Sequence, residues 1–271
     1  MAIEIVDHSR LPWEIPLGSR MAIHDASSQR LYVEADLTQF GRLTATPEQA
    51  NYLLNVLRAR AGTKVRVFNG RDGEWAAEIA DVSKRTCILA LAGPTRAQVQ
   101  GPDIDYLFAP LKRTRLDYMV QKATEMGVRR LRPVITRHTI SERINLERLR
   151  ANAIEAAEQC GVLWVPEVLE PVKLDRLLAT WNIGSVSERQ LIFADEGAAI
   201  ANPIEALQAV PRGPLAVLIG PEGGFHADER TVLRAQPFTH PISLGPRIIR
   251  ADTAAVAALA LVNAVLGDWG Q

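Results

Sequence analysis

Two strand-loop-helix units in immediate succession near the carboxyl end constrain the fold of this chain more than any other feature. The first has the apolar run Leu215–Ile219 and the loop 220–225, and the second has the run 241–245 and the loop 246–250 before an Ala-rich helix. A short apolar run bounded by Gly and Pro is typical of a strand buried on both faces of a parallel sheet. Open α/β sheets bind ligands in the loops at the carboxyl ends of such strands. We therefore predict that the two loops form one pocket.

The region before these units continues the alternation of strands and helices. Apolar runs predict strands at 105–110, 131–135 and Gln190–Ala194, and helical spacing predicts helices at 115–126 and 145–159. This alternation indicates an α/β fold with a mostly parallel sheet and helices on both faces.

Residues 1–95 look mostly β. Runs typical of strands occupy residues 30–34, 63–68, 74–79 and 86–91, with turn residues at 69–73 that predict a hairpin. Thr46-Pro47 begins a helix that the apolar spacing extends over residues 50–59. We predict a small β-barrel.

The stretch 93–102, which contains several Gly and Pro residues, separates the predicted domains, 1–95 and 96–271.

The charges are distributed unevenly, although 31 basic and 31 acidic residues give a formal net charge of zero. Residues 96–150 carry 12 basic and 6 acidic side chains, whereas residues 151–271 carry 8 basic and 14 acidic ones. A basic middle segment suggests an anionic partner such as nucleic acid. A solvated helix surface explains the same counts, and charge alone leaves both interpretations open.

The two loops exclude some ligands and leave others open. The loop 220–225 lacks the Lys-Ser/Thr pair of a P-loop, and no strand is followed by Gly-x-Gly-x-x-Gly, so neither an ATP nor a Rossmann site is supported. The glycines allow close backbone approach to a ligand, although a tight turn also explains them. Arg247 and Arg250 precede a helix start, where residues 252–253 can form a cap. An RNA phosphate, a carboxylate ligand or Glu222 would balance the two arginines.

The last helix, predicted over residues 254–266, is apolar nearly all round. Such a helix must be buried on most faces. Either its far face packs on a second subunit, or it is fully buried within one chain.

Composition also limits which cellular compartment and which cofactors we expect. The two cysteines fit no zinc motif, and the five histidines form no ligand spacing, so we expect no metal. A chain with two cysteines is typical of a reduced, intracellular protein. Residues 1–8 do not resemble a signal peptide, and the apolar stretch 254–266 is too short to span a bilayer. We expect a cytoplasmic protein without a membrane anchor.

Four segments occur in an order that points to a known family. They read KATEMGV at residues 122–128, EAAEQC at 155–160, LIGPEGGF at 218–225 and LGPRIIRADTA at 244–254. The first is similar to the K-x-T-E-L-G-V segment, and the second to the A-x-E-Q segment, of the RsmE family. These are bacterial methyltransferases of small-subunit ribosomal RNA, in the SPOUT superfamily. The resemblance covers nearly the whole chain, including the N-terminal barrel.

The resemblance implies a fold and an activity. The family has an N-terminal PUA-like β-barrel that helps to hold RNA and a SPOUT α/β domain with a C-terminal trefoil knot, a rare exception to unknotted topology. Its members transfer a methyl group from S-adenosylmethionine to N3 of one uridine in 16S rRNA, and the active unit is a homodimer. The two knot loops bind the cofactor.

The resemblance, with the charge pattern, also implies site residues. The residues expected to bind the cofactor are Phe193, Leu218, Ile219, Gly220, Pro221, Glu222, Gly223, Gly224, Leu244, Gly245, Ile248, Ile249, Arg250, Thr253 and Ala254. The residues expected to contact rRNA phosphates are Lys112, Arg113, Arg115, Lys122, Arg129, Arg130, Arg132, Arg137 and Arg143. This chain has Val162 and Asp252 where the family often has Arg and Glu.

Uridine N3 carries a proton at neutral pH, and negative charge spreads onto the flanking carbonyl oxygens when it leaves. Our hypothesis is that Arg250 or Arg247 stabilises this charge. Glu222 is a candidate general base, or else an ion-pair partner or cap. Two other functions stay open: a SPOUT methyltransferase of tRNA or 23S rRNA, and a non-catalytic RNA-binding assembly factor.

Overall fold

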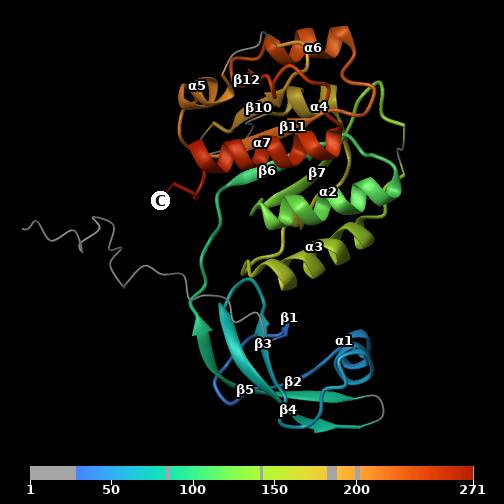
Figure 1. Ribbon diagram of the computed structural model, residues 1–271, viewed down its shortest axis with the longest axis vertical. Coiled ribbons are helices and arrows are strands. Elements are labelled where there is room, and N and C mark those ends of the chain that lie inside the picture. The colour runs from blue at the N-terminus through green and yellow to red at the C-terminus, as the bar shows by residue number, and fades with distance from the viewer. Residues whose placement is uncertain (1–28, 84–85, 141–142, 182–187, 199–201, 271) are drawn as a thin grey trace, which may run out of the picture.

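The computed structural model describes residues 29–83, 86–140, 143–181, 188–198 and 202–270. A smaller β domain and a larger α/β domain lie end to end along the long axis (Figure 1). The sequence interpretation of residues 1–8, and the histidines His8 and His24, lie outside the described residues.

The N-terminal domain is a five-stranded mixed sheet with one short helix. The elements are β1 (Arg30–Tyr32), β2 (Arg42–Thr44), α1 (Pro47–Asn51), the π-helical turn η1 (Tyr52–Val56), β3 (Lys64–Phe68), β4 (Glu74–Val82) and β5 (Cys87–Arg96). The strand order is β1-β3-β4-β5-β2, with β1 parallel to β3 and the other pairs antiparallel. The β3–β4 hairpin confirms the sequence prediction.

Local chemistry explains where this domain agrees with prediction and where it differs. Thr46 caps α1 as expected, because its hydroxyl accepts from the Gln49 amide and the Gln49 side chain bonds back to the Thr46 amide. The predicted helix over 50–59 is wrong beyond Asn51, because the residues after it form η1, which ends at Val56 with Leu57 as its C-cap. β5 runs to Arg96, beyond the predicted end, since Arg96 pairs with Glu74 of β4. The three-residue β2 is too short to show an alternating pattern.

The C-terminal domain is built on a parallel sheet. The elements are β6 (Ile104–Phe108), α2 (Arg113–Glu125), β7 (Arg130–Ile135), α3 (Leu146–Cys160), β8 (Glu167–Val168), β9 (Val172–Lys173), α4 (Leu174–Ala179), β10 (Gln190–Ala194), α5 (Pro203–Gln208), β11 (Leu215–Ile219), α6 (Ala227–Arg234), β12 (Thr239–Ile242) and α7 (Ala251–Val265). The strand order is β12-β10-β11-β6-β7-β8, with β9 beside β7, and the strand pairs are parallel. The predicted strand at 241–245 is instead β12, two residues earlier. The knot stays a prediction.

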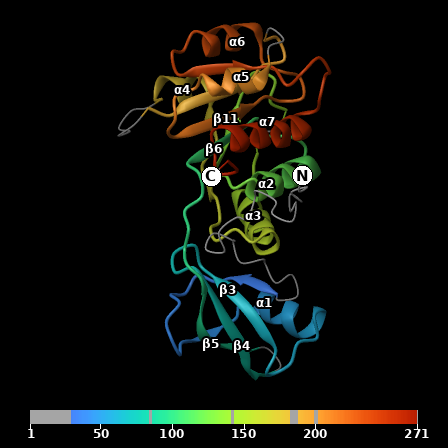
Figure 2. The ribbon, with the colours of Figure 1, turned by 60° about the vertical axis from the view of Figure 1, so that its left-hand side comes forward.

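Alternate residues of the central strands enter two separate cores. On β6, Tyr106 and Phe108 belong to the cluster that includes α2, α3, α5 and α7, whereas Leu107 belongs to the cluster that includes α4 and α6. Figure 2 shows α4 and α7 on opposite sides of the strands. This alternation confirms the predicted α/β fold with helices on both faces, and it explains why the strand sequences are apolar throughout.

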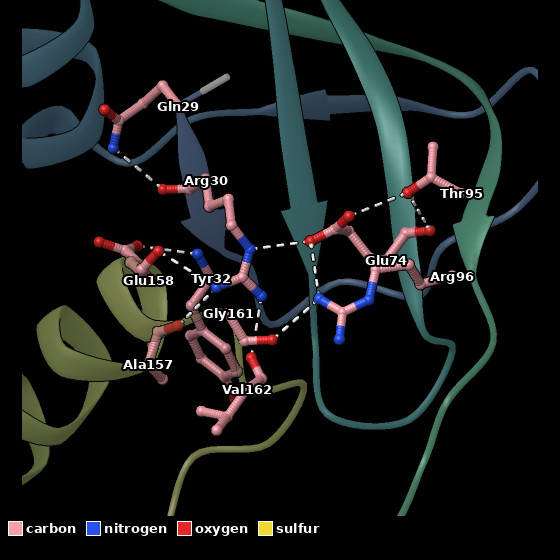
Figure 3. A network of polar contacts seen from close by, with 10 residues as sticks. All are labelled: Gln29, Arg30, Tyr32, Glu74, Thr95, Arg96, Ala157, Glu158, Gly161 and Val162. Carbon is pink, nitrogen blue, oxygen red and sulfur yellow. Dashed lines mark hydrogen bonds and ion pairs between the residues drawn. The ribbon is translucent and has the colours of Figure 1, made fainter. Parts of the chain in front are cut away.

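A buried arginine joins the two domains (Figure 3). Arg30 of β1 is 2% exposed, and its Nε donates to Glu74 Oε2 at 2.8 Å. Its two terminal nitrogens donate to the carbonyls of Ala157 and Glu158, at 2.6 and 3.1 Å, and of Val162, at 2.8 Å. The carbonyls at the end of a helix lack partners within the helix and favour a cation. Arg30 therefore ties the β domain to the end of α3, while the 95/96 domain boundary stays a prediction.

Glu158 at this junction gives the fold a pH dependence. Its Oε1 accepts from the Tyr32 amide at 2.8 Å, and burial raises its pKa to about 7 from 4.5. The folded chain thus holds this proton more tightly than the unfolded chain, so the free energy of unfolding falls as pH rises from about 4.5 to about 7. Glu158→Gln removes this titration and keeps the oxygen. We expect the variant to exceed its parent by less than about 1 kcal/mol at pH 5 and by up to about 3 kcal/mol at pH 8.

Urea unfolding at pH 5, 6, 7 and 8 measures this difference, and other carboxylates cancel between variant and parent. A constant difference over this pH range would contradict the assignment.

Candidate active site

Three loops meet at one edge of the parallel sheet. β10 pairs with β12 on one side and with β11 on the other, so the loops after Ala194, Ile219 and Ile242 follow neighbouring carboxyl ends. The Asp195 amide donates to the Ile242 carbonyl at 3.0 Å and holds two of these loops together. The predicted proximity of the two C-terminal loops is confirmed, and a third loop, after β10, joins them.

These loops enclose a cavity of about 480 Å³, within the size range of small-molecule sites. Of the residues predicted to bind the cofactor, the following line it: Ile219, Gly220, Pro221, Glu222, Gly224, Leu244, Gly245, Ile248, Ile249, Arg250 and Ala254. Its walls also include Arg115, Ala194, Asp195, Glu196, Ala198, Phe225, Ser243, Pro246, Arg247 and Ala251.

Four predicted cofactor residues are not among the lining residues. Phe193 and Leu218 are completely buried in the strands and face the core that contains α4 and α6. Gly223 lies beside His138, whose Nδ1 is 3.1 Å from the Gly223 carbonyl oxygen. Thr253 is exposed on α7. Phe193 still supports the cavity wall, because its ring meets the lining Phe225 edge to face at 5.1 Å.

Two glycines let the walls of the cavity pack closely against each other. A Cβ on Gly220 would lie 2.5 Å from the Phe225 ring, and Phe225 is only 8% exposed. Gly224 has a φ of +67°, and a Cβ there would lie 2.4 Å from Glu196 Oε1. A larger residue at either position would collide with these side chains, and the positive φ of Gly224 is typical of a tight turn, so the turn alone explains both glycines. Their approach to a ligand stays a prediction.

Ion pairs with α6 hold the loop after β10 in place. The Asp195 side chain is fully buried and pairs with Arg230 at 3.3 Å and Arg234 at 2.5 Å, both on α6. It also accepts from the Gly197 amide at 2.9 Å. Arg230 reaches Glu196 at 2.8 Å. This wall was not predicted from the sequence, although an acidic pair, Asp195 and Glu196, directly follows a predicted parallel strand.

Glu222 forms an ion pair with Arg115 at the start of α2. An ion pair with an arginine was one of the roles that the sequence left open for Glu222, with Arg247 or Arg250 as the arginine, and in the structure this arginine is Arg115. The expected RNA contact of Arg115 stays a prediction. Because Arg115 lines the cavity, α2 contributes a cation to a site otherwise made of the C-terminal loops.

The start of α7 borders the cavity with two arginines. Arg247 and Arg250 are both exposed and both line the cavity. Arg250 occupies the cap position of α7, where no side chain forms a cap hydrogen bond, so the expected cap by residues 252–253 is wrong. Asp252 instead lies 3.7 Å from Arg250 Nε and accepts from the Thr253 amide at 3.0 Å. The shorter Asp252 therefore still contacts an arginine of the site.

The basic segment divides into surface and structural residues. Lys112 and Arg113 are exposed at the start of α2, and Arg143 is exposed before α3. Lys122 pairs with Glu125 at 2.7 Å, and Arg137 pairs with Asp228 at 2.7 Å.

Two of the arginines near β7 contact other parts of the protein, and the expected contacts of all three with rRNA stay a prediction. Arg129 donates to the Gly101 carbonyl at 2.9 Å, and Arg130 pairs with Asp103 at 2.7 Å. The buried Nε of Arg132 has no hydrogen-bond partner among the described residues. Val162 packs at the domain junction beside Phe68, away from the cavity.

Within the part of the chain that the structure describes, no group of three or more His, Cys, Asp or Glu side chains could hold a metal ion. No helix among the described residues is long and apolar enough to cross a membrane.

Comparisons with known proteins agree with this architecture. The RNA methyltransferase domain family matches residues 99–263, and the RNA methyltransferase PUA domain matches residues 45–91. The ribosomal RNA small subunit methyltransferase E of Rickettsia conorii is 29% identical over 86% of this chain and 94% of its own length. The protein of the same name from Synechocystis is 28% identical over 93% of this chain and 82% of its own length.

Solved structures share the fold over most of the chain. A methyltransferase of Legionella pneumophila, solved with bound S-adenosylmethionine, has a TM-score of 0.76 and 28% identity over 89% of this chain and 99% of its own. An rRNA methyltransferase of Porphyromonas gingivalis has a TM-score of 0.70 and 26% identity over 88% and 98%. Since the family model covers more than half of its length, the chain belongs to the RNA methyltransferase family that its motifs identify as RsmE, in the SPOUT superfamily.

Proposed function

We propose that this chain transfers a methyl group from S-adenosylmethionine to N3 of a uridine in the 16S rRNA of the small ribosomal subunit. The observation that carries the proposal is the glycine-walled cavity at the carboxyl ends of β10, β11 and β12, in a member of an RNA methyltransferase family. The relatives' names and the cofactor bound in the Legionella protein support it.

The lining residues fit this cofactor in size and in chemistry. Ile219, Leu244 and Ile249 offer apolar surface for an adenine ring, and Gly220 and Gly224 let the backbone come close to it. The carboxylates of Glu196 and Glu222 add acceptors and negative charge beside the cavity. When bound, the cofactor supplies a methyl group on a positively charged sulfur.

The two arginines at the start of α7 suit the target base. N3 lies on the Watson–Crick edge, so the uridine must be unpaired to enter the site. Arg250 and Arg247 supply positive charge at the cavity, where they stabilise the negative charge that develops on the uracil oxygens as N3 loses its proton. Holding the base in line with the methyl group contributes on the order of 7–11 kcal/mol at best.

The ion pair with Arg115 favours a positioning role for Glu222. A carboxylate paired with an arginine is held ionised and is a weak base. Glu222 then anchors the loop 220–225 to α2 beside the cavity. Proton removal by Glu222 is the competing role, and it requires the pair to open.

We propose that Lys112 and Arg113 are the main phosphate contacts near the site, because both are exposed and neither makes an ion pair among the described residues. Arg115, Lys122 and Arg137 already face a carboxylate. Removing the two exposed cations (Lys112→Ala with Arg113→Ala) should weaken RNA binding and reduce the slope of log affinity against log salt by about 1.4–1.8.

Lys122→Ala is the matched control for this variant, with a smaller expected change in slope because Glu125 already balances that charge. Filter binding from 50 to 300 mM salt measures the slopes. Equal slopes for the double variant and its parent would rule out these contacts.

The outer face of α7 supports a homodimer. Val256, Ala257, Ala260 and Leu261 keep part of their surface exposed in one chain, so full burial within a single chain does not explain the apolar helix. A second copy would cover this face. Light scattering should give twice the 29.8 kDa mass of one chain, and a monomer at micromolar concentration would refute the dimer.

Nucleoside mass spectrometry tests the proposed reaction. The purified chain, S-adenosylmethionine and 16S rRNA, free or in small subunits, should yield 3-methyluridine, and rRNA from a strain that lacks the protein should lack one such base. Methylation of tRNA or 23S rRNA alone would favour a SPOUT methyltransferase of one of those RNAs. Cofactor-independent RNA binding would favour a non-catalytic RNA-binding assembly factor. A cytoplasmic location belongs to the same proposal, since ribosomal RNA is the substrate.

A further inference from the structure

A histidine outside the cavity contacts the glycine-rich loop 220–225 from the side of β7. His138 lies in the loop that follows β7, and its Nδ1 is 3.1 Å from the carbonyl oxygen of Gly223 and 3.1 Å from that of Gly224. Gly224 lines the cavity, whereas His138 is not among the lining residues. Since β6 separates β7 from β11 in the sheet, the contact reaches across the end of β6.

The two carbonyls fix the protonation of the His138 ring. A carbonyl oxygen only accepts hydrogen bonds, so Nδ1 carries the hydrogen and shares it between both carbonyls. The loop itself leaves these two carbonyls to an outside donor, because its turn uses another one: the Gly224 amide donates to the Pro221 carbonyl at 2.9 Å. His138 is the donor that reaches them.

The backbone beside His138 is anchored on the start of α6. The Arg137 amide donates to Glu229 Oε1 at 2.9 Å, and Glu229 Oε2 accepts from the His226 amide at 3.0 Å. The Arg137 side chain pairs with Asp228 at 2.7 Å and lies 2.8 Å from His226 Nδ1. His138 is therefore held by the helix that directly follows the loop it contacts.

The loop 220–225 is thus held by two elements, the loop after β7 and α2. A Cβ on Gly223 would lie 3.4 Å from His138 Cβ, so the histidine and the loop backbone are in close contact. Glu222 of the same loop pairs with Arg115 of α2. Arg115 also lines the cavity, whereas His138 can act on a ligand only through the loop. A loop that is fixed before the ligand arrives loses less conformational freedom on binding.

We propose that His138 is a positioning residue of the cofactor site. Its Nδ1–H holds the carbonyls of Gly223 and Gly224, and so keeps the turn 221–224 in the conformation that forms a wall of the cavity. The ring contacts neither the cofactor nor the target base. This inference rests on the proposed binding of S-adenosylmethionine in the cavity.

Two substitutions of equal size test the hydrogen bond. His138→Asn places an amide N–H near the position of Nδ1, whereas His138→Asp places a carboxylate oxygen there, opposite two carbonyl oxygens. His138→Ala removes the donor and should weaken binding of S-adenosylmethionine about 3- to 10-fold, the usual contribution of one hydrogen bond. Asparagine should restore most of this loss, and the aspartate variant should bind more weakly than the alanine variant. Because the cofactor carries a net positive charge, charge alone would make the aspartate variant bind more tightly.

Calorimetric titration of the full-length variants without RNA measures these affinities, and thermal melting shows whether each variant folds. With 16S rRNA as substrate, the KM for the cofactor should rise in the alanine variant, while kcat and the KM for RNA stay close to those of the parent. Nitrogen-15 NMR of the histidine-labelled parent should show a proton on Nδ1 of His138, in the signal that His138→Asn removes.

The results that overturn this inference differ from those that refute the proposed function. Folded alanine and asparagine variants that lose the same affinity would assign the effect to packing of the ring, and no loss in either would show that the bond does not support the loop. A fall in kcat with an unchanged KM for the cofactor would make His138 catalytic, and a proton on Nε2 alone would contradict the hydrogen bond. A folded parent that binds no S-adenosylmethionine refutes the proposed function instead.

Discussion

Replacement of Gly220 by alanine should weaken binding of S-adenosylmethionine roughly 10- to 100-fold, the range that overpacking a closed site produces. The added Cβ would lie 2.5 Å from the Phe225 ring. Phe225 has no free space to retreat into, because it packs edge to face on the completely buried Phe193. The ring must therefore move toward the cavity that the proposed cofactor fills. Calorimetric titration of the variant and the parent measures the loss.

Gly93→Ala is the matched control, because a Cβ at Gly93 meets nothing within 4 Å. It should leave the cofactor affinity unchanged. Thermal melting of both variants shows whether Gly220→Ala still folds. A folded Gly220→Ala protein with the affinity of its parent would show that the loop 220–225 does not contact the cofactor.

Alanine at Arg250 or Arg247 should lower kcat about 100- to 1,000-fold for whichever arginine faces the uracil oxygens, the usual cost of removing one donor aimed at developing charge. Cofactor affinity should change little, because the apolar and glycine walls of the cavity remain. Lysine at the same position should recover part of the rate, since it keeps the charge but loses the planar fork.

Single-turnover methyl transfer with saturating cofactor separates this effect from binding. If the double alanine variant transferred the methyl group at the rate of its parent, neither arginine would take part in the mechanism. Because Asp252 lies 3.7 Å from Arg250, Asp252→Asn offers a positioning check. It should affect the rate less than loss of the arginine itself.

Most strands and helices could be predicted from the sequence, because local patterns of apolar residues determine them. The runs Gln190–Ala194 and Leu215–Ile219 have the predicted bounds, since parallel strands buried on both faces are continuously apolar. The two glycine-rich loops follow them, and parallel topology brings these loops together. The strand β12 was misplaced, because the residues after it are apolar but belong to the loop.

The missing half of the site comes from contacts that no local pattern encodes. Arg115 meets Glu222 across about a hundred residues of sequence, and a basic helix start looks the same whether it faces RNA or a loop. Asp195 is buried only because Arg230 and Arg234 of α6 reach it.

Titration of the purified full-length chain with S-adenosylmethionine tests the central claim most directly, namely that the loops after β10, β11 and β12 form a binding site for this methyl donor. The account predicts one site per chain with a dissociation constant below about 1 mM, and weaker binding in Gly220→Ala. Absence of any heat of binding at millimolar concentration in the folded chain would contradict it.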